Sequence, residues 1–188
     1  MGKVLEALEQ ADRQLFLFLN GFHHPILDEV MIILSGKFTL IPFYLLLLWL
    51  VYKKTGLVKT LIILLFAGLC IVLADQGAVK LFKEVIGRYR PCHNLEIRHM
   101  VYTTGHCGGQ FGFVSNHAAN SMAVATFMFF VLKNYYRRIA WLLGAWVFLV
   151  GYSRIYLGVH YPLDIFGGWI FGLFCGVLVY LIYKKLIK

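Results

Sequence analysis

Four long, nearly uncharged apolar stretches constrain this chain more than any other feature of its sequence. They cover residues 57–74, 114–132, 139–157 and 165–183, about 18 to 19 residues each. A helix needs about 20 apolar residues to cross the roughly 30 Å of hydrocarbon in a bilayer. Only 14% of the 188 residues are charged, whereas a soluble domain carries about 25% charged residues. The chain is therefore predicted to be an integral membrane protein.

A fifth apolar stretch, 38–52, precedes these four, and we expect residues 26–36 to lengthen it at its start. The second span is expected to continue through 75–83. In lipid the backbone must satisfy its own hydrogen bonds, so each span is predicted to be a helix. The predicted fold class is all-α, a polytopic membrane bundle of about five transmembrane helices. Residues 1–188 are expected to form a single domain.

The N-terminal segment 1–22 has a helical pattern of its own. Apolar residues recur in it at helical spacing: Val4, Leu8, Ala11, Leu15 and Leu19. Three acidic residues within its first twelve positions argue against a cleavable signal peptide. We predict an amphipathic helix that lies along the membrane interface. A frayed polar terminus is the alternative.

Basic residues gather in three short segments that would share one side of the membrane. These segments hold nine of the eighteen Lys and Arg residues: Lys53, Lys54, Lys59, Lys133, Arg137, Arg138, Lys184, Lys185 and Lys188. Short juxtamembrane loops rich in Lys and Arg are cytoplasmic. Segments 83–113 and 153–164 are therefore predicted to face the periplasm or exterior from the inner (plasma) membrane. The net charge of +9 does not indicate nucleic-acid binding, because the cations lie at span ends and not in a solvated stripe.

The first polar cluster on the outer face is KEVIGRYRP, residues 83–91. Lys83 and Arg90 are seven residues apart, which is about two helical turns. We expect one face of a helix to direct both cations to a single point. The alternative is that these side chains extend to lipid headgroups.

The second cluster is FVSNHAAN, residues 113–120, where Ser115, Asn116 and His117 open the third span. A helix N-terminus offers free N–H groups and a positive dipole end, which together favour an anion. The alternative is ordinary helix capping by Ser115 or Asn116, with His117 as a polar residue of the membrane interface.

The third cluster is SRIYLGVHYPLD, residues 153–164. Asp164 follows His160 by four residues, and Pro162 suits the first turn of a helix that starts there. This spacing lets the carboxylate accept a hydrogen bond from one imidazole nitrogen and leaves the other nitrogen as a nucleophile. The alternative is that Asp164 only caps its helix while His160 faces headgroups. Arg154 adds a third cation to the outer face.

Together the three clusters supply the groups that phosphoryl transfer requires. Cations hold the phosphoryl oxygens, one histidine attacks, and another protonates the leaving oxygen. No carboxylate cluster or Cys/His pattern indicates a metal ion in this role.

The order and spacing of the clusters resemble the type 2 phosphatidic acid phosphatase (PAP2) family, which also includes vanadium haloperoxidases. The family motifs are written KxxxxxxRP, PSGH and SRxxxxxHxxxD. The first is intact from Lys83 to Pro91 and the third from Ser153 to Asp164, while the second appears only as VSNH, 114–117. The agreement extends over about 80 residues.

The resemblance implies a role for each motif residue. His160 would be the nucleophile that forms a phosphohistidine, and Asp164 would orient it. His117 would be the general acid for the leaving group. Neither a metal nor another cofactor would be required. The phosphoryl oxygens would be held by Lys83, Arg90, Arg154, Ser115 and backbone N–H groups near Asn116.

The second motif departs from the family pattern at two positions. Val114 stands in place of a proline and Asn116 in place of a glycine. Asn tolerates a left-handed backbone better than most residues, so the anion site can survive the change. We hypothesise that Asn116 adds a side-chain contact to the substrate. Unchanged kcat and KM for Asn116→Gly on every lipid phosphate would contradict this hypothesis.

Several smaller features carry expectations of their own. Cys92 and Cys107 lie in the predicted outer loop, where a disulfide is permitted; free thiols and a zinc site with His93, His99 and His106 are the alternatives. Asp75 and Lys80 are expected to form a structural ion pair, with a catalytic role as the alternative. Close helix packing is expected at four glycines: Gly167, Gly168, Gly172 and Gly176.

The sequence thus predicts a metal-independent phosphatase that acts on lipid phosphates or diphosphates at the outer leaflet. Undecaprenyl diphosphate is the first choice of substrate, and lipid A and phosphatidylglycerol phosphate are the alternatives. A phosphotransferase with the same phosphohistidine is the nearest rival activity. A non-catalytic lipid-binding or transport protein is the rival from another class. The expected partners are the bilayer and the lipid phosphate, with no obligate protein partner.

Overall fold

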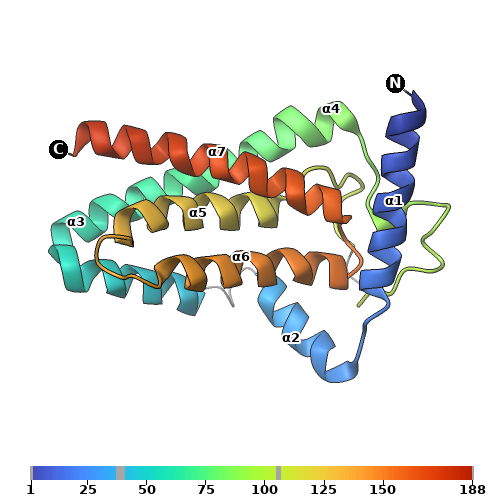
Figure 1. The fold of residues 1–188 in the computed structure, drawn as a ribbon, viewed down its shortest axis with the longest axis horizontal. Coiled ribbons are helices and arrows are strands. Elements are labelled where there is room, and N and C mark those ends of the chain that lie inside the picture. The colour runs from blue at the N-terminus through green and yellow to red at the C-terminus, as the bar shows by residue number, and fades with distance from the viewer. Residues whose placement is uncertain (1, 37–40, 105–106, 188) are drawn as a thin grey trace.

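The computed structural model describes residues 2–36, 41–104 and 107–187, and within them the regular structure is helical (Figure 1). The elements in chain order are α1 (Gly2–Asn20), α2 (Pro25–Ser35), α3 (Ile41–Gly77), the π-helix η1 (Ala78–Lys83), α4 (Glu84–Ile86), the 3₁₀-helix η2 (Pro91–His93), α5 (Asn116–Leu132), α6 (Ile139–Tyr156) and α7 (Pro162–Leu186). The predicted all-α membrane fold is confirmed.

Three of these helical runs are long and apolar enough to cross a membrane: Ile41–Ile86, Ile139–Tyr156 and Pro162–Leu186. The first run is not straight, because Gly56 has φ 76° and ψ 175°. That left-handed φ is open to glycine and reverses the chain, so α3 folds back on itself at one end of the molecule (Figure 1). The two arms match the first two predicted spans. The total of five crossings stays a prediction.

The expectation that residues 26–36 lengthen the first span is wrong. They form the separate helix α2, which ends at Ser35, and Gly36 continues in an extended conformation with ψ 136°. Pro25 at the first turn of α2 and the side chain of His24 as its N-cap fix its start. In Figure 1, α2 leans away from the bundle and reaches it beside α6.

Helix α5 lies at the centre of the bundle and contacts α3, α6 and α7 (Figure 1). Four of its seventeen residues are alanine, and ten of the seventeen are buried. Small side chains let the helices around it approach closely, which is how helices associate in lipid. A Cβ at Gly172 of α7 would lie 2.2 Å from the carbonyl oxygen of Ala119. The close packing expected at the α7 glycines is confirmed.

Gly172→Ala is therefore expected to destabilise the bundle. The added methyl group would push α7 off α5, which costs about 1–3 kcal/mol in a packed interior. Gly144→Ala is the matched control, because a Cβ at Gly144 of α6 meets nothing within 4 Å. We expect thermal unfolding in detergent to show a lower Tm for the first variant and an unchanged or slightly higher Tm for the second. Equal Tm values would contradict this packing account.

Helix α1 runs across the ends of α6 and α7 (Figure 1). Its buried stripe is Asp12, Phe16 and Asn20, spaced by four residues. The apolar residues Val4, Leu8 and Leu15 stay exposed instead. That arrangement is what an interfacial helix presents, one side to the protein and an apolar side to lipid.

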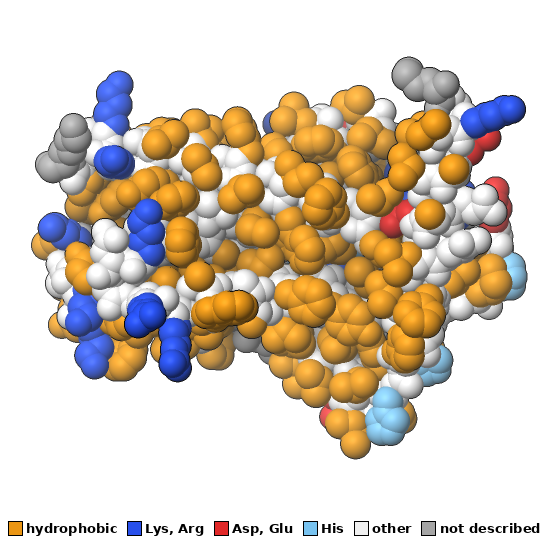
Figure 2. Space-filling model, viewed as in Figure 1, with side chains coloured by type: hydrophobic (Ala, Val, Ile, Leu, Met, Phe, Trp, Pro, Cys, Tyr) orange, Lys and Arg blue, Asp and Glu red, His pale blue; other side chains and the backbone are white. Residues whose placement is uncertain are grey.

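Basic side chains gather at the end of the bundle opposite α1. Figure 2 shows most of the Lys and Arg side chains of that face at the end where α3 reverses and the C-terminus lies, with apolar side chains covering the middle. The described members of the predicted cytoplasmic group are all exposed: Lys53, Lys54, Lys59, Lys133, Arg137, Arg138, Lys184 and Lys185. Their common position agrees with the three basic segments sharing one side.

Candidate active site

A cavity of about 570 Å³ opens near the α1 end of the bundle, among α3, α5 and α6. Six of the residues predicted for the site line it: Lys83, Arg90, Asn116, His117, Arg154 and His160. They come from three segments that are far apart in the sequence, 83–91, 113–120 and 153–164. The structure thus brings the three polar clusters to one place.

His160 forms one wall of this cavity, with Asp164 behind it. The Nδ1 atom of His160 lies 3.3 Å from Oδ2 of Asp164, and their side chains are 1% and 0% exposed. Asp164 is the third residue of α7, where its Oδ2 also accepts the N–H of Tyr161 at 3.0 Å. Pro162 begins the helix. The i, i+4 spacing therefore produces the predicted contact, and capping and orientation of His160 are two functions of one carboxylate.

Burial lowers the pKa of His160 well below its ordinary value, and the nearby Arg90, Arg154 and Lys83 lower it further. The imidazole is therefore neutral at pH 7. A neutral ring whose Nδ1 donates to Asp164 keeps the lone pair of Nε2.

This pKa shift predicts how stability depends on pH. The unfolded chain binds a proton at His160 below about pH 6.5, whereas the folded protein resists it. Stability is therefore lost as the pH falls below about 6.5, by up to about 1.4 kcal/mol per pH unit. We expect Tm in detergent to fall more steeply between about pH 6.5 and 5.5 for the wild type than for His160→Gln. Parallel curves would contradict a buried neutral His160.

Two further residues hold Asp164, and sequence reasoning did not assign them this role. Arg88 donates to Oδ1 of Asp164 at 2.9 Å and to Oδ2 of Asp12 at 2.6 Å. Asp12, on α1, also accepts the N–H of Leu163 at 2.9 Å. The guanidinium of Arg88 lies over the ring of Tyr161, 4.1 Å from its centroid. The sequence signal that could have indicated this contact is the spacing of Asp12, Phe16 and Asn20, four residues apart on one face of the predicted N-terminal helix.

The predicted helical face shared by Lys83 and Arg90 is wrong. Gly87, with φ 64°, ends the helix after Ile86, which is the common way for a helix to stop. Arg90 then lies in an extended segment that pairs with the returning chain: its N–H donates to Gln110, and Gly112 donates to Arg88. Lys83 therefore reaches the cavity from the π-helix η1 and Arg90 from this extended segment, and not along one helix face.

Backbone carbonyl groups hold Arg90 in place. Its Nε lies 3.3 Å from the oxygen of Phe111, and one terminal nitrogen lies 3.5 Å from that of Val159. The side chain is 9% exposed. Carbonyl oxygens orient a guanidinium without neutralising it, so its charge remains available to an anion.

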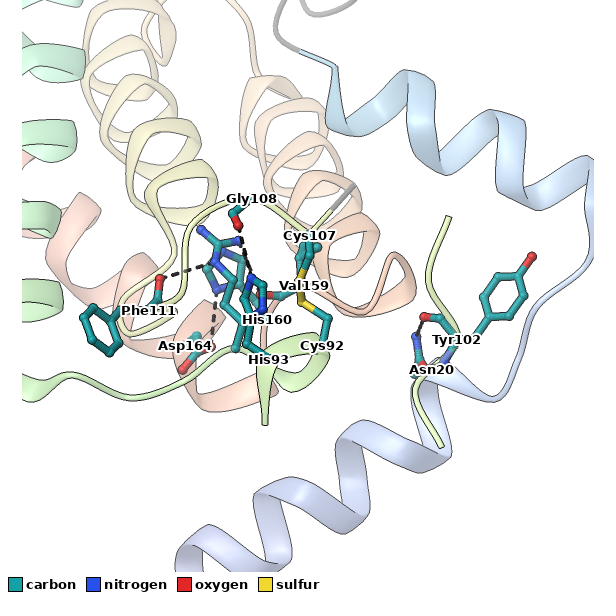
Figure 3. The surroundings of a disulfide bond; sticks show 11 residues. Asn20, Cys92, His93, Tyr102, Cys107, Gly108, Phe111, Val159, His160 and Asp164 are labelled. Carbon is teal, nitrogen blue, oxygen red and sulfur yellow. Dashed lines mark hydrogen bonds and ion pairs between the residues drawn. A yellow bond between two sulfur atoms is a disulfide. The ribbon is translucent and has the colours of Figure 1, made fainter. Parts of the chain in front are cut away.

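A disulfide joins Cys92 and Cys107 next to this segment. Figure 3 shows the bond and its surroundings, with His93, Val159 and His160 among the residues drawn. The zinc alternative does not fit this arrangement. Cys92, His93 and Cys107 have ligand atoms within 4.8 Å of one another, but disulfide sulfurs offer no thiolate. His106 lies outside the described residues.

At the N-terminus of α5, Ser115 is the capping residue, which the sequence left as the alternative. Ser115 is fully buried, and its Oγ caps the helix by accepting the N–H of Ala118. It is not among the residues that line the cavity. Asn116 does line the cavity, but its side-chain nitrogen donates to Oδ1 of Asp75 at 2.8 Å. His117, the next residue of α5, also lines the cavity.

The expected ion pair between Asp75 and Lys80 is also wrong. Among the described residues, the ion pairs join other side chains. Asp75 faces α5 instead and accepts hydrogen bonds from Asn116 and Asn120. The π-helix that begins at Ala78 follows directly. Such an irregular turn is frequent at functional sites.

Arg154, in the last turn of α6, completes the cationic part of the cavity. A terminal nitrogen of its guanidinium donates to Oγ of Ser35 at the end of α2. The chemistry of the whole set is that of an anion site beside a neutral imidazole. Three cations, two histidines and the first turn of α5 surround one space.

Comparisons with known proteins agree with this geometry. The profile of the PAP2 superfamily matches residues 56–188. A lipid A 4'-phosphatase of Bacteroides thetaiotaomicron is 37% identical, over 97% of this chain and 81% of the relative. A lipid A 4'-phosphatase of Porphyromonas gingivalis is 34% identical, over 95% of this chain and 75% of the relative.

A solved structure has the same fold over nearly the whole chain. It is the crystal structure of the first transmembrane PAP2 type phosphatidylglycerolphosphate phosphatase from Bacillus subtilis. The TM-score is 0.71 at 25% identity, covering 96% of this chain and 88% of the other. With its three membrane-capable helical runs and the superfamily match, the chain belongs to the PAP2 superfamily and is a membrane phosphatase.

Proposed function

We propose that this protein removes a phosphate from a lipid A-type headgroup through a phosphohistidine on His160. The observation that carries the proposal is the His160–Asp164 pair, 3.3 Å apart, at a cavity that also holds Lys83, Arg90 and Arg154. The pair supplies an oriented nucleophile. The three cations supply the positive charge that a metal ion supplies in other phosphatases.

The reaction takes place in two displacements. In the first, Nε2 of His160 attacks phosphorus, the bond to the sugar oxygen breaks, and His117 gives its proton to that oxygen. Asp164 stabilises the imidazolium that forms, because it accepts the hydrogen bond of Nδ1–H. In the second, His117 takes a proton from water, the oxygen of that water bonds to phosphorus, and the P–N bond breaks. Phosphate leaves and His160 is neutral again.

The site is proposed to face the periplasm or exterior from the inner membrane. The cavity lies near α1, at the opposite end of the bundle from the exposed basic group. Because basic loops stay in the cytoplasm, this end reaches the outer leaflet.

The choice of substrate rests on similarity. The Bacteroides and Porphyromonas relatives, both lipid A 4'-phosphatases by name, match more than nine-tenths of this chain. We therefore place lipid A before undecaprenyl diphosphate, the first choice from sequence.

Phosphate release by the purified protein in detergent tests the proposal. The substrates are lipid A, undecaprenyl diphosphate and phosphatidylglycerol phosphate, each with and without an added alcohol or lipid acceptor. We expect the highest kcat/KM on lipid A, with phosphate released to water. Transfer to the acceptor without release would indicate a phosphotransferase, and no turnover of any lipid would indicate a non-catalytic protein. Either outcome would contradict the proposal.

A further inference from the structure

One wall of the cavity carries hydrogen-bond acceptors instead of cations. We call it the acceptor wall and define it by Asp75 of α3 and by Asn116 and Asn120 of α5, all three of which line the cavity. Oδ1 of Asp75 accepts from Nδ2 of Asn116 at 2.8 Å and from Nδ2 of Asn120 at 3.2 Å. The backbone oxygen of Asp75 lies 3.3 Å from the same nitrogen of Asn116.

These contacts determine how both amides are turned. Both amide nitrogens donate to Oδ1 of Asp75, so each Asn directs its NH₂ group to Asp75. The Oδ1 atoms of Asn116 and Asn120 then point away from the carboxylate. Both oxygens are buried and have no hydrogen-bond partner among the described residues. Buried polar atoms normally have a partner, so a donor group of a ligand in the neighbouring cavity would satisfy these two oxygens once a small side-chain movement uncovers them.

The donor cannot be the phosphate itself. A phosphate monoester or diphosphate presents oxygen acceptors, which the acceptor wall repels and which Lys83, Arg90 and Arg154 attract. The cavity therefore has two regions that favour different parts of one ligand. The phosphate goes to the cations and His160, and a group rich in O–H or N–H goes to the acceptor wall. Sugars carry hydroxyl and amide donors on carbons next to a phosphorylated one, whereas a polyprenyl chain carries none.

We propose that Asp75, Asn116 and Asn120 form a specificity subsite that accepts hydrogen bonds from the hydroxyl or amide groups of a sugar next to the scissile phosphate. The inference rests on the proposed function and names the part of the substrate that this protein recognises. It also gives a role to Asn116, which stands in place of the family glycine. Its hydrogen bond to Asp75 fixes the position of an acceptor group at the N-terminus of α5. A few placed polar groups of this kind decide which ligand a pocket takes.

Two variants test the subsite on two substrates. Asn120→Leu keeps the size of the side chain and removes its acceptor, and Asn116→Gly restores the family residue. For each we expect KM on lipid A to rise about tenfold or more, because the substrate loses a buried partner. On undecaprenyl diphosphate, kcat/KM of Asn120→Leu is expected to stay within about twofold of the wild type. The matched control is Asn134→Leu, the same change at an exposed turn far from the cavity, with both substrates unaffected.

Each result bears on the proposal. A selective loss on lipid A supports the subsite. An equal loss on both substrates, or no loss on either, would show that the three side chains only join α3 to α5 and would overturn it. A wild type that hydrolyses undecaprenyl diphosphate and not lipid A would overturn it too.

Binding separates this inference from the proposed function. In the His160→Ala background, lipid A micelles are expected to raise Tm, and adding Asn120→Leu is expected to remove most of that shift. This measurement needs no turnover. If the wild type releases no phosphate but the shift behaves in this way, the phosphatase proposal fails and the subsite stands. If the shift is the same with and without Asn120→Leu, the subsite fails whatever the activity.

Discussion

His160→Ala is expected to lower kcat for phosphate release by about 10⁴-fold or more. The variant removes the atom that attacks phosphorus, and groups that act with a nucleophile contribute little without it. The cations around the cavity remain, so KM is expected to change by less than about tenfold. Initial rates of phosphate release from lipid A by the purified variant measure both quantities.

Two further variants serve as comparisons for His160→Ala: Asp164→Asn as an intermediate case and His99→Ala as a control. Asp164→Asn keeps the nucleophile but loses the carboxylate 3.3 Å from its Nδ1, so its loss in kcat should be large yet smaller than that of His160→Ala. His99 is exposed, and its replacement should leave kcat/KM within about twofold. A His160→Ala protein with the wild-type Tm and more than a tenth of the wild-type kcat would contradict the nucleophile assignment.

Arg88→Met is expected to have the largest effect on stability. Arg88 bridges Asp12 and Asp164, whose side chains are only 2% and 0% exposed. Removing the shared cation leaves two buried carboxylates without their partner, and removing one member of a buried pair costs about 3–5 kcal/mol. We also expect kcat to fall about tenfold or more with little change in KM, because Oδ1 of Asp164 is no longer held. Thermal unfolding and lipid A kinetics in the same detergent measure the two effects.

Arg13→Met is the matched control for this variant. Arg13 also bridges two carboxylates, those of Glu9 and Glu96, but their side chains are 47% and 68% exposed. Exposed pairs contribute about 0–1 kcal/mol, so Tm and kcat should stay close to the wild type. The variant Asp12→Asn should reproduce part of the loss seen with Arg88→Met. Adding it to Arg88→Met should cost less than it does alone, since the pair acts as a unit. Equal effects of Arg88→Met and Arg13→Met would contradict the bridge.

Much of the fold could be read from the sequence because lipid allows few solutions. Long apolar runs must be helices, and the basic residues at Lys53, Arg138 and Lys184 mark one end. The i, i+4 spacing of His160 and Asp164 also predicted their contact, since both lie where α7 begins. Residues that are four apart near the start of a helix lie on the same face, so their spacing in sequence predicts their contact.

Contacts that depend on tertiary structure were beyond the sequence. Lys83 and Arg90 meet because Gly87 ends a helix and the chain pairs with Gln110, which no seven-residue spacing indicates. Asp75 pairs with Asn116 across two helices instead of with Lys80 along one. The bridge from Asp12 to Asp164 crosses about 150 residues of chain. Periodicity shows which residues share a helix face, but not which faces meet.

Trapping the phosphoryl group on His160 tests the central claim most directly. His117→Ala should slow the water step, while p-nitrophenyl phosphate, whose leaving group needs no acid, still phosphorylates the enzyme. Mixing the His117→Ala protein with p-nitrophenyl phosphate and quenching in base should give a burst of about one nitrophenol per active enzyme. Mass spectrometry should find an acid-labile, base-stable phosphoryl group on the peptide that contains His160. Phosphate released by the wild type with no burst in the variant, or a phosphoryl group on another residue, would contradict the phosphohistidine account.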